Sequence, residues 1–322
     1  RSEMMMGAFK HAVFSEWYRE NEKFLKPPIC NKLYAGGQLK VMFVGGKQAN
    51  DRGDYHVEDG EEFFYMIKGN MVLRVLEKGK HRDIIIKEGE SFLLPARIPH
   101  SPQRPPNSLG LVIERERKDD EIDALQWFVK GTTDVLWRRT FRCYDLGKDL
   151  VPVVKAFQAS REAKTGRKTP KDQWPRGGPP PIMPLPRPLD THTSLPSPTV
   201  LEKWVQNHAG ALKDKFVELF KGEDFNVQIG CGAHNIGPIS HTSEAFYFLL
   251  KGKGQLTEEG SEAKKLNIVE GSMVVVDAMA KHFLSTGEGS LLIALTWPTA
   301  PCHEPRVDAP TIYRHFKPVS ML

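Results

Sequence analysis

The sequence predicts a mainly β protein made of two small, related barrels of the jelly-roll type, with a few flanking helices and a proline-rich linker. The first observation is a series of short apolar runs between residues 39 and 117, separated by glycine-containing turns. Strands spaced at about 8–12 residues with such turns are typical of a sandwich or barrel. The second observation is that residues 227–297 repeat this pattern after a proline-rich interruption. The chain of 322 residues is therefore expected to fold as two barrels.

The repeat is visible at two strand–turn junctions. The run FYFLLKG, which ends at Gly252, resembles FFYMIKG, which ends at Gly69, and the shift is 252 − 69 = 183 residues. The run GSMVVV, which begins at Gly271, resembles GESFLL, which begins at Gly89, and the shift is 271 − 89 = 182 residues. Two matches at nearly one offset indicate an internal duplication.

The same pattern divides the chain into four segments. They are an N-terminal helix and lead-in (1–38), the first barrel with a trailing helix (39–168), the proline-rich linker (169–199) and the second barrel (200–322). The N-terminal helix is expected within residues 9–24. Ten prolines between residues 170 and 198 exclude a helix or a central strand there. Thr199 and Glu202 form a capping-box pattern, which predicts a helix over residues 200–220.

Composition and charge exclude several classes of protein. Apolar residues make up 40% of the chain and the net charge is only +5, so neither intrinsic disorder nor nucleic-acid binding is expected. The apolar runs are far shorter than the roughly 20 residues that span a bilayer, so no membrane association is expected. The four cysteines include no C-x-x-C pair, which excludes a zinc ribbon and favours a reducing compartment. We therefore expect a cytoplasmic protein and take a monomer as the working expectation, although the sequence does not determine the oligomeric state.

Three residues of the first barrel have the types and spacing of a metal site. His56 ends a strand, and the turn at residues 58–60 is expected to bring Glu62 back across a hairpin facing His56. His100 follows 38 residues after Glu62, at another strand end. Two imidazoles and one carboxylate suit a non-haem Fe(II) that must bind both an organic substrate and O₂. Taken singly, each of these side chains could equally be a surface residue or a hydrogen-bonded core residue.

Glycines and a proline at matched spacings connect these residues to a known fold. Glu62-x6-Gly69 and Gly89-x5-Pro95-x4-His100 resemble the two sequence motifs of cupins. The start of the first motif departs from that pattern. Gln48 stands where cupins have an opening glycine, and Asp54 stands where many have a first histidine. The second departure leaves three candidate ligands instead of four.

Four longer strings resemble one family more closely. The strings PPICNKL, LKVMFVGG, DYHVEDGEE and LLPARIPHSPQR begin at residues 27, 39, 54 and 93. They are similar to sequences of the 3-hydroxyanthranilate 3,4-dioxygenase family, and this close resemblance covers residues 27–150. The absence of a C-terminal pair of C-x-x-C motifs places the chain with the two-barrel, single-metal form of that family, the animal-type bicupin.

The resemblance implies a reaction and a cofactor. Enzymes of this family use Fe(II) and O₂ to open the ring of 3-hydroxyanthranilate. The product, 2-amino-3-carboxymuconate semialdehyde, closes to quinolinate, a precursor of NAD in the kynurenine pathway of tryptophan catabolism. The implied partners are this small molecule and O₂.

The resemblance also implies roles for residues around the metal. Arg52 and Arg104 would hold the substrate carboxylate, because a guanidinium can donate two parallel hydrogen bonds to it. Glu114 would hydrogen-bond the substrate amine or hydroxyl and steer its proton, and Asn31 would contribute a hydrogen bond from a lid. Surface positions for Arg52, Arg104 and Glu114 remain the alternative. Two further arginines, Arg97 and Arg115, lack the positional match and are expected at the surface.

The second barrel matches the metal-site pattern only in part. His282 lies 11 residues after Gly271, as His100 lies 11 residues after Gly89. The alignment puts Ala245 in the place of Glu62 and Ile239 in the place of His56.

His241 and Glu244 lie nearby in the sequence, but they are not at the required strand positions. We therefore expect a structural half without a full metal site. Two other functions stay open, a different cupin oxygenase and a non-catalytic bicupin that binds or stores a small ligand.

Overall fold

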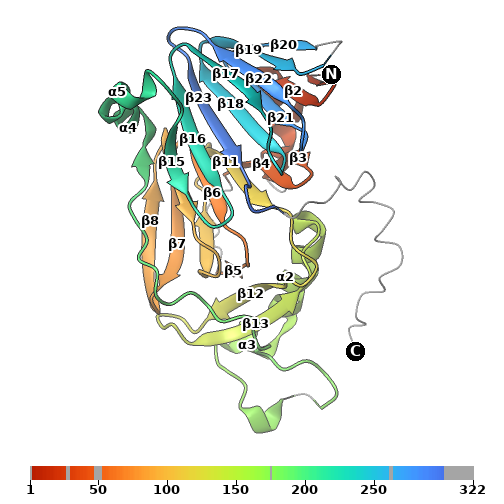
Figure 1. The fold of residues 1–322 in the computed structure, drawn as a ribbon. Coiled ribbons are helices and arrows are strands. Elements are labelled where there is room, and N and C mark those ends of the chain that lie inside the picture. Colours follow the sequence, from red (N-terminus) through yellow and green to blue (C-terminus); the bar gives the residue numbers. More distant parts are fainter. Residues whose placement is uncertain (1, 27–29, 47–52, 175, 261–263, 301–322) are drawn as a thin grey trace.

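In the part of the chain that the structure describes, strands dominate and form four sheets, which confirms the predicted mainly β, two-barrel fold. The computed structural model describes residues 2–26, 30–46, 53–174, 176–260 and 264–300. Figure 1 shows the second barrel with the N-terminal strands at one end of the molecule and β12, β13 and α2 at the other.

Two six-stranded sheets make the first barrel. One sheet has the order β13 (Val135–Phe141), β12 (Asp123–Phe128), β5 (Tyr55–Val57), β10 (His100–Gln103), β7 (Met71–Glu77), β8 (Lys80–Ile86). The other has the order β14 (Thr199–Val200), β9 (Glu90–Leu94), β6 (Glu62–Lys68), β11 (Leu109–Arg115), β4 (Leu39–Gly45), β3 (Asn31–Gly36). Apolar side chains of both sheets, including Leu73, Phe64 and Val112, meet in a common core.

A seven-stranded and a four-stranded sheet make the second barrel. The larger has the order β1 (Glu3–Met6), β2 (Phe9–Val13), β21 (Ser272–Val276), β18 (Ala245–Lys251), β23 (Leu291–Thr296), β16 (Asn226–Cys231), β15 (Val217–Lys221). The smaller has the order β17 (His234–Ile239), β22 (His282–Thr286), β19 (Lys253–Glu258), β20 (Lys265–Val269). Side chains such as Val274 and Leu284 join the two sheets in one core.

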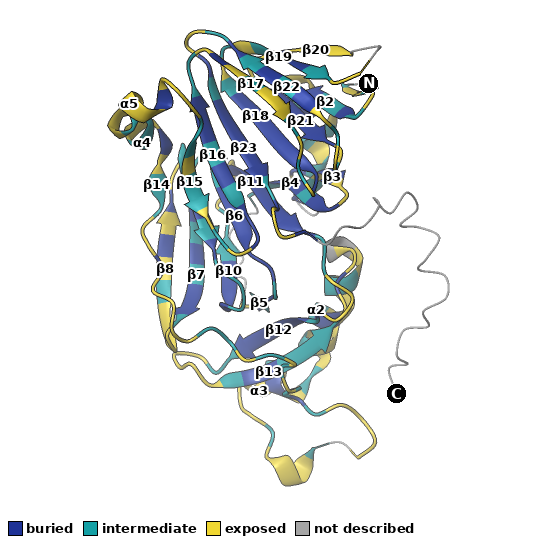
Figure 2. Cartoon of the chain, in the orientation of Figure 1, coloured by how far each residue is buried: buried dark blue, intermediate teal, exposed yellow. Residues whose placement is uncertain are grey.

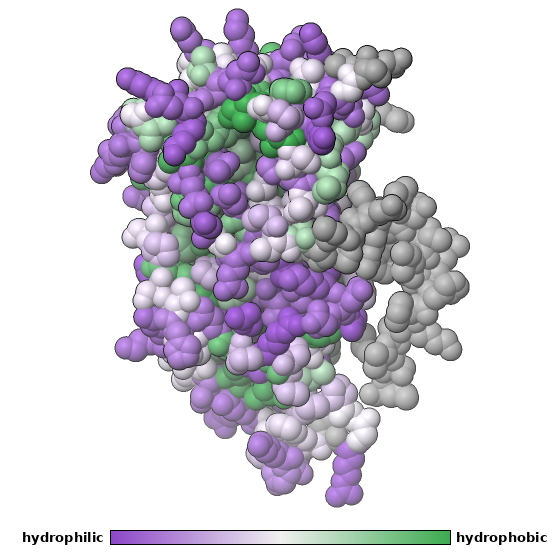
Figure 3. Space-filling view, in the orientation of Figure 1, coloured by the Kyte–Doolittle hydropathy of each residue, from purple (hydrophilic) through white to green (hydrophobic). Residues whose placement is uncertain are grey.

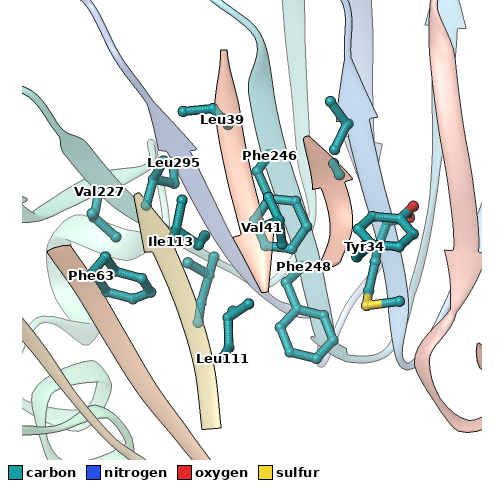
Figure 4. Packing of buried hydrophobic residues seen from close by; sticks show 14 of the residues in the cluster. Tyr34, Leu39, Val41, Phe63, Leu111, Ile113, Val227, Phe246, Phe248 and Leu295 are labelled. Carbon is teal, nitrogen blue, oxygen red and sulfur yellow. Dashed lines mark hydrogen bonds between the residues drawn. The ribbon is translucent and has the colours of Figure 1, made fainter. Parts of the chain in front are cut away.

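The two barrels share a third hydrophobic cluster that joins them face to face. It combines Phe63 and Ile113 of the first barrel with Phe246 and Leu295 of the second (Figure 4). The strands that meet here are buried over much of their length, as the dark blue of β11, β18 and β23 in Figure 2 shows. Strands buried on both faces read as continuous apolar runs, which is how β6, β11 and β18 look in the sequence.

Alternation along β6 and β11 sets the direction of the site residues. In β6, Phe63 belongs to the cluster between the barrels, whereas Phe64 belongs to the core of the first barrel. In β11, Ile113 and Val112 divide in the same way. Successive side chains of a strand point to opposite faces, so the residue before Phe63 and the residue after Ile113 both point into the first barrel. These residues are Glu62 and Glu114.

The helices differ from the sequence prediction in two places. The N-terminal helix α1 (Phe14–Asn21) is shorter than expected, because residues 9–13 form β2 and pair with β21 of the second barrel. The helix predicted over residues 200–220 is divided into α4 (Leu201–Asn207) and α5 (Ala209–Leu212), and β15 follows. The capping box is wrong: the cap position of α4 is Val200, without a side-chain hydrogen bond, and Thr199 lies in β14. The pairing of β2 with β21 and of β15 with β16 overrides the local helical pattern in residues 9–13 and 217–221.

The other helices flank the first barrel. They are α2 (Leu146–Ala159), α3 (Arg161–Thr165) and the short 3₁₀ turns η1 (Glu22–Phe24) and η2 (Lys171–Gln173). None of the helices in the described part of the chain is long and apolar enough to cross a membrane. On the face in Figure 3, hydrophilic side chains are spread over the surface and hydrophobic ones show only in small areas.

The proline-rich segment runs along the first barrel. Ile182 forms a β-bridge with Arg138 of β13, and Leu195 is buried in the core of the barrel. Between them, Arg187 donates a hydrogen bond of 2.8 Å to Asp59 and forms a second ion pair with Asp120. The segment is thus attached to the loop that precedes Glu62. The four-part division of the chain stays a prediction.

Candidate metal centre

A cavity of about 1360 Å³ opens into the first barrel and holds the predicted site residues. Its polar end is lined by histidine, carboxylate and arginine side chains of β5, β10, β11 and the segments next to them. Apolar side chains such as Met42, Val44 and Val112, together with α2, form other parts of the wall. A deep, mostly apolar cavity with a few convergent polar groups is the usual form of a small-molecule site.

His100 and Glu62 form the centre of the polar end. His100 is the first residue of β10, is buried, and donates a hydrogen bond of 3.0 Å from Nδ1 to the carbonyl of Ile98. Its Nε2 therefore lacks the proton in the neutral ring and faces Oε2 of Glu62 at 3.0 Å. Burial lowers the pKa of His100, but the Glu62 carboxylate, the hydrogen bond to Ile98 and the charge of Glu114 together raise this pKa above its ordinary value.

His56 lies beside His100, but not across a hairpin from Glu62. His56 in β5 is the register partner of His100, and the ring centroids lie 5.8 Å apart. β5 and β6 belong to different sheets, so the predicted hairpin between His56 and Glu62 is wrong. The chain crosses at residues 58–61 from one sheet of the barrel to the other, and both side chains still line the same cavity. Nε2 of His56 lies 3.4 Å from Oδ2 of Asp54.

Glu58 is a member of the site that the sequence prediction missed. Among the described residues, the group whose ligand atoms all lie within 4.8 Å of one another is Glu58, Glu62 and His100. Oε1 of Glu58 lies 4.0 Å from Nε2 of His100. Burial, together with the neighbouring carboxylates, raises the pKa of Glu58 well above its ordinary range despite Arg117. The sequence pattern that could have revealed Glu58 is its position two residues after His56, since residues two apart in an extended chain share a face.

Arg117 is the second residue that was missed. This buried guanidinium contacts Oε2 of Glu114 at 2.5 Å and Oδ2 of Asp123 at 2.8 Å, and it also pairs with Glu58. Burial raises the pKa of Glu114, but Arg117 outweighs it, so this pKa lies below its ordinary value. Glu114 is also the register partner of Glu62 on β6. One cation therefore holds the carboxylates that surround the candidate ligands.

The predicted substrate-binding residues are only partly within the described structure. Arg104 lines the cavity and packs against Gly110, where an added Cβ would lie 2.7 Å from Nη1 of the arginine. Asn31 lines the cavity at the start of β3 and is exposed. Arg52 lies outside the described residues.

The expectation that Arg115 is a surface residue is wrong. Arg115 is 2% exposed, and it donates hydrogen bonds of 2.7 Å to both carboxylate oxygens of Glu121. Its Nε lies 2.8 Å from Asp224 of the second barrel. The sequence did not reveal its burial, because Asp224 comes from a distant part of the chain. The other arginine placed at the surface, Arg97, is half-buried, and its backbone donates to the carbonyl of Glu58.

The residues at the polar end fit a divalent metal ion. Oε2 of Glu62 is buried and has no hydrogen-bond partner of good geometry among the described residues, although His100 lies 3.0 Å away. A carboxylate oxygen and an unprotonated imidazole nitrogen at this distance require a proton or a metal cation beside them. The Nδ1 hydrogen bond of His100 fixes its ring orientation, as is common for metal-ligating histidines.

The equivalent place in the second barrel is filled by a tyrosine. His282 is the register partner of Ile239. Ala245 pairs with Val276 in the second barrel in the same way as Glu62 pairs with Leu94 in the first. The predicted equivalence of Ala245 with Glu62 is therefore confirmed by the strand register. The hydroxyl of Tyr247 lies 2.9 Å from Nε2 of His282 and 3.5 Å from Nε2 of His241.

Glu244 is turned away from these side chains. Its carboxylate accepts a hydrogen bond of 2.9 Å from the backbone of Leu39 in the first barrel.

Comparison with known proteins gives the family. The family model for 3-hydroxyanthranilic acid dioxygenase matches residues 6–158. Human 3-hydroxyanthranilate 3,4-dioxygenase is 39% identical over 290 residues, which cover 90% of this chain and 96% of the relative. The chain belongs to the 3-hydroxyanthranilate 3,4-dioxygenase family. The match to the human relative extends over both barrels, so the second barrel belongs to the family as well as the first.

Other family members are similarly close. The enzyme of Danio rerio is 42% identical over 257 residues, covering 78% of this chain and 84% of the relative. The enzyme of Nematostella vectensis is 40% identical over 284 residues, covering 87% and 97%. Among solved structures, the chain is similar to a cupin 2 conserved barrel domain protein from Leptotrichia buccalis, with a TM-score of 0.41, 12% identity and coverage of 84% and 88%.

Proposed function

We propose that this protein opens the ring of 3-hydroxyanthranilate with O₂, using Fe(II), to give 2-amino-3-carboxymuconate semialdehyde, which cyclises to quinolinate. The observation that carries the proposal is the polar end of the first-barrel cavity. There, His100 and Glu62 face each other beside His56, in a chain that belongs to this enzyme family over 90% of its length. The product would feed NAD biosynthesis.

His56, Glu62 and His100 are the proposed metal ligands. Glu58 competes with His56 for the third place, since its carboxylate lies nearer to His100 and Glu62. However, Glu58 is already paired with Arg117, whereas His56 is adjacent to His100 on the neighbouring strand. Two imidazoles and one carboxylate form the set that non-haem Fe(II) oxygenases use, with positions left for substrate and O₂. Bound Fe(II) would supply the electron transfer between the aminophenol and O₂.

The protein residues around the ligands would bind and orient the substrate. Arg104, at the cavity wall, would donate hydrogen bonds to the substrate carboxylate together with Arg52. Arg117 keeps Glu114 ionised, so Glu114 can accept a hydrogen bond or a proton from the substrate amine or hydroxyl. Apolar side chains such as Val44 and Val112 would keep bulk water away from the reacting ring.

Oxygen uptake distinguishes this proposal from the two alternatives. Protein loaded with Fe(II) under anaerobic conditions is mixed with 3-hydroxyanthranilate, and air is then admitted. We expect one O₂ consumed for each substrate molecule and quinolinate as the final product. Uptake with only a catechol or a thiol would indicate a different cupin oxygenase. Stoichiometric ligand binding without any uptake would indicate a non-catalytic bicupin.

A further inference from the structure

Glu61, the neighbour of the proposed ligand Glu62, reaches out of the first barrel into the second. Its buried carboxylate accepts three backbone hydrogen bonds, from Glu223 at 2.9 Å and from Asp224 and Phe225 at 3.0 Å each. The donors belong to the turn between β15 and β16, which lies beside β6 in Figure 1. Successive backbone N–H groups that converge in this way form an anion-binding concavity.

The turn is shaped around the carboxylate. The N–H of Gly222 donates to the carbonyl of Phe225 at 2.8 Å, which closes the turn. A Cβ on Gly222 would lie 2.1 Å from Oε2 of Glu61 and 2.3 Å from Oε1. Only glycine at position 222 therefore lets the carboxylate reach the three N–H groups.

A second set of contacts holds the backbone of the same segment. The N–H of Glu61 donates to Oδ2 of Asp224 at 3.1 Å, and the same oxygen lies 2.8 Å from Nε of Arg115. Arg115 also donates from Nη2 to the carbonyl of Asp59 at 3.2 Å. Main chain and side chain of residues 59–61 are thus both held at the boundary between the barrels.

We propose that Glu61 is a positioning residue for the metal centre, and that the β15–β16 turn of the second barrel holds Glu62 in its ligating orientation through it. The proposal rests on the assignment of Glu62 as a metal ligand. Glu62 and Glu61 are adjacent and point to opposite sides of the chain, so fixing the outward side chain and its backbone fixes the direction of the inward one. The second barrel, whose described residues include no such group of ligand atoms, then contributes to the metal affinity of the first.

Metal affinity measured beside stability tests this role. The apo protein is titrated anaerobically with Fe(II), and with Co(II) as a spectroscopic probe, for the wild type and for Glu61→Ala. We expect the dissociation constant to rise by about 10-fold or more, as for other residues that orient metal ligands. Gly222→Ala keeps Glu61 but displaces its carboxylate, and it should weaken metal binding in the same direction.

Glu244→Ala is the matched control. Glu244 is also a buried glutamate that bridges the barrels, since it accepts the N–H of Leu39, but it does not adjoin a proposed ligand. This variant should lose stability in urea unfolding while its metal dissociation constant stays that of the wild type. If the metal dissociation constant of Glu244→Ala rose as much as that of Glu61→Ala, any loss of contact between the barrels would weaken metal binding. That result would overturn the proposal.

Two further outcomes separate this proposal from the proposed function. Wild-type metal affinity in folded Gly222→Ala and Glu61→Ala, with affinity lost in Glu62→Ala, would overturn the positioning role alone. Wild-type affinity in Glu62→Ala would overturn the ligand assignment, and the positioning role with it. If Glu61→Ala does not fold, Gly222→Ala decides.

Discussion

The two barrels present equivalent histidines on equivalent strands, yet the side chains around these histidines differ. His100 and His282 each donate from Nδ1 to the backbone carbonyl two residues earlier, at 3.0 and 3.1 Å. In the adjacent strand, the register partner of His100 is His56, whereas that of His282 is Ile239. The backbone arrangement that orients the imidazole has been kept in both barrels.

The difference lies in charge. In the second barrel burial lowers the pKa of His241 to about 4, lowers that of His282 and raises that of Tyr247, so this cluster is neutral near pH 7. In the first barrel, the carboxylates of Glu62 and Glu58 lie 3.0 and 4.0 Å from Nε2 of His100. Glu58 is paired in turn with Arg117, which also holds Glu114 and Asp123. We therefore expect metal binding to depend on a few charged side chains placed on a shared scaffold.

The strongest way to break the comparison is Glu62→Ala, which gives the first barrel the residue found at position 245 in the second. Metal affinity should fall by more than about 100-fold, because a ligand is lost directly, and substitutions that only reorient ligands cost 10–100-fold. Metal content after gel filtration and oxygen uptake are the measurements. Glu62→Gln keeps the size of the side chain and should lose less metal affinity than Glu62→Ala. Wild-type metal content in Glu62→Ala would refute the assignment.

Arg117→Met tests the charge balance of the first barrel. It would leave Glu58, Glu114 and Asp123 buried without their cation, so the free energy of unfolding of the apo protein should fall by about 3–5 kcal/mol. Urea unfolding measures this change. Thr299 lies at the corresponding offset of 299 − 117 = 182 residues in the second barrel, is exposed, and its hydroxyl donates to the carbonyl of Glu223. Thr299→Ala should therefore cost only about 1 kcal/mol. Equal losses in the two variants would contradict the special role of Arg117.

Arg104→Ala tests substrate recognition with the metal retained. Loss of a charge-assisted hydrogen bond costs about 1.5–3 kcal/mol, so kcat/KM for 3-hydroxyanthranilate should fall by about 10–150-fold, mainly through KM. Steady-state oxygen uptake and metal analysis check the two parts. Arg104→Lys keeps the charge but not the planar guanidinium, so its kcat/KM should lie between that of the wild type and that of Arg104→Ala. An unchanged KM would place the carboxylate site elsewhere.

The smallest effect is a pH dependence at the barrel boundary. Burial raises the pKa of Glu244 to about 7, and the hydrogen bond from Leu39 only partly offsets this. The folded state thus binds more protons than the unfolded state between about pH 4.5 and 7, and stability falls as pH rises through this window, by an amount on the order of 2 kcal/mol. Urea unfolding at pH 5 and pH 8 should show this loss. Glu244→Gln should flatten it, and an equal slope in both proteins would contradict the assignment.

The sequence predicted what local spacing encodes. The interval from Gly89 to His100 recurs from Gly271 to His282, because it describes one strand, its turn and the next strand end. For that reason the barrel repeat and the place of Ala245 agree with the strand register.

Contacts between sheets and barrels could not be predicted from one sequence. Glu58 and Arg117 meet because two sheets converge, and Arg115 meets Asp224 of the other barrel. The N-terminal strand β2 pairs with β21 at the far end of the chain, so residues 9–13 form a strand in spite of their helical pattern. These features depend on long-range packing, which no local pattern of residues records.

Metal stoichiometry in a pair of histidine variants tests the central claim most directly. His100→Ala and His282→Ala change the equivalent residue in the two barrels, and bound iron per chain is measured for each after anaerobic loading. The account predicts one iron in the wild type and in His282→Ala, and none in His100→Ala. Loss of one iron in His282→Ala, or retention of full iron in His100→Ala, would contradict a single metal centre in the first barrel.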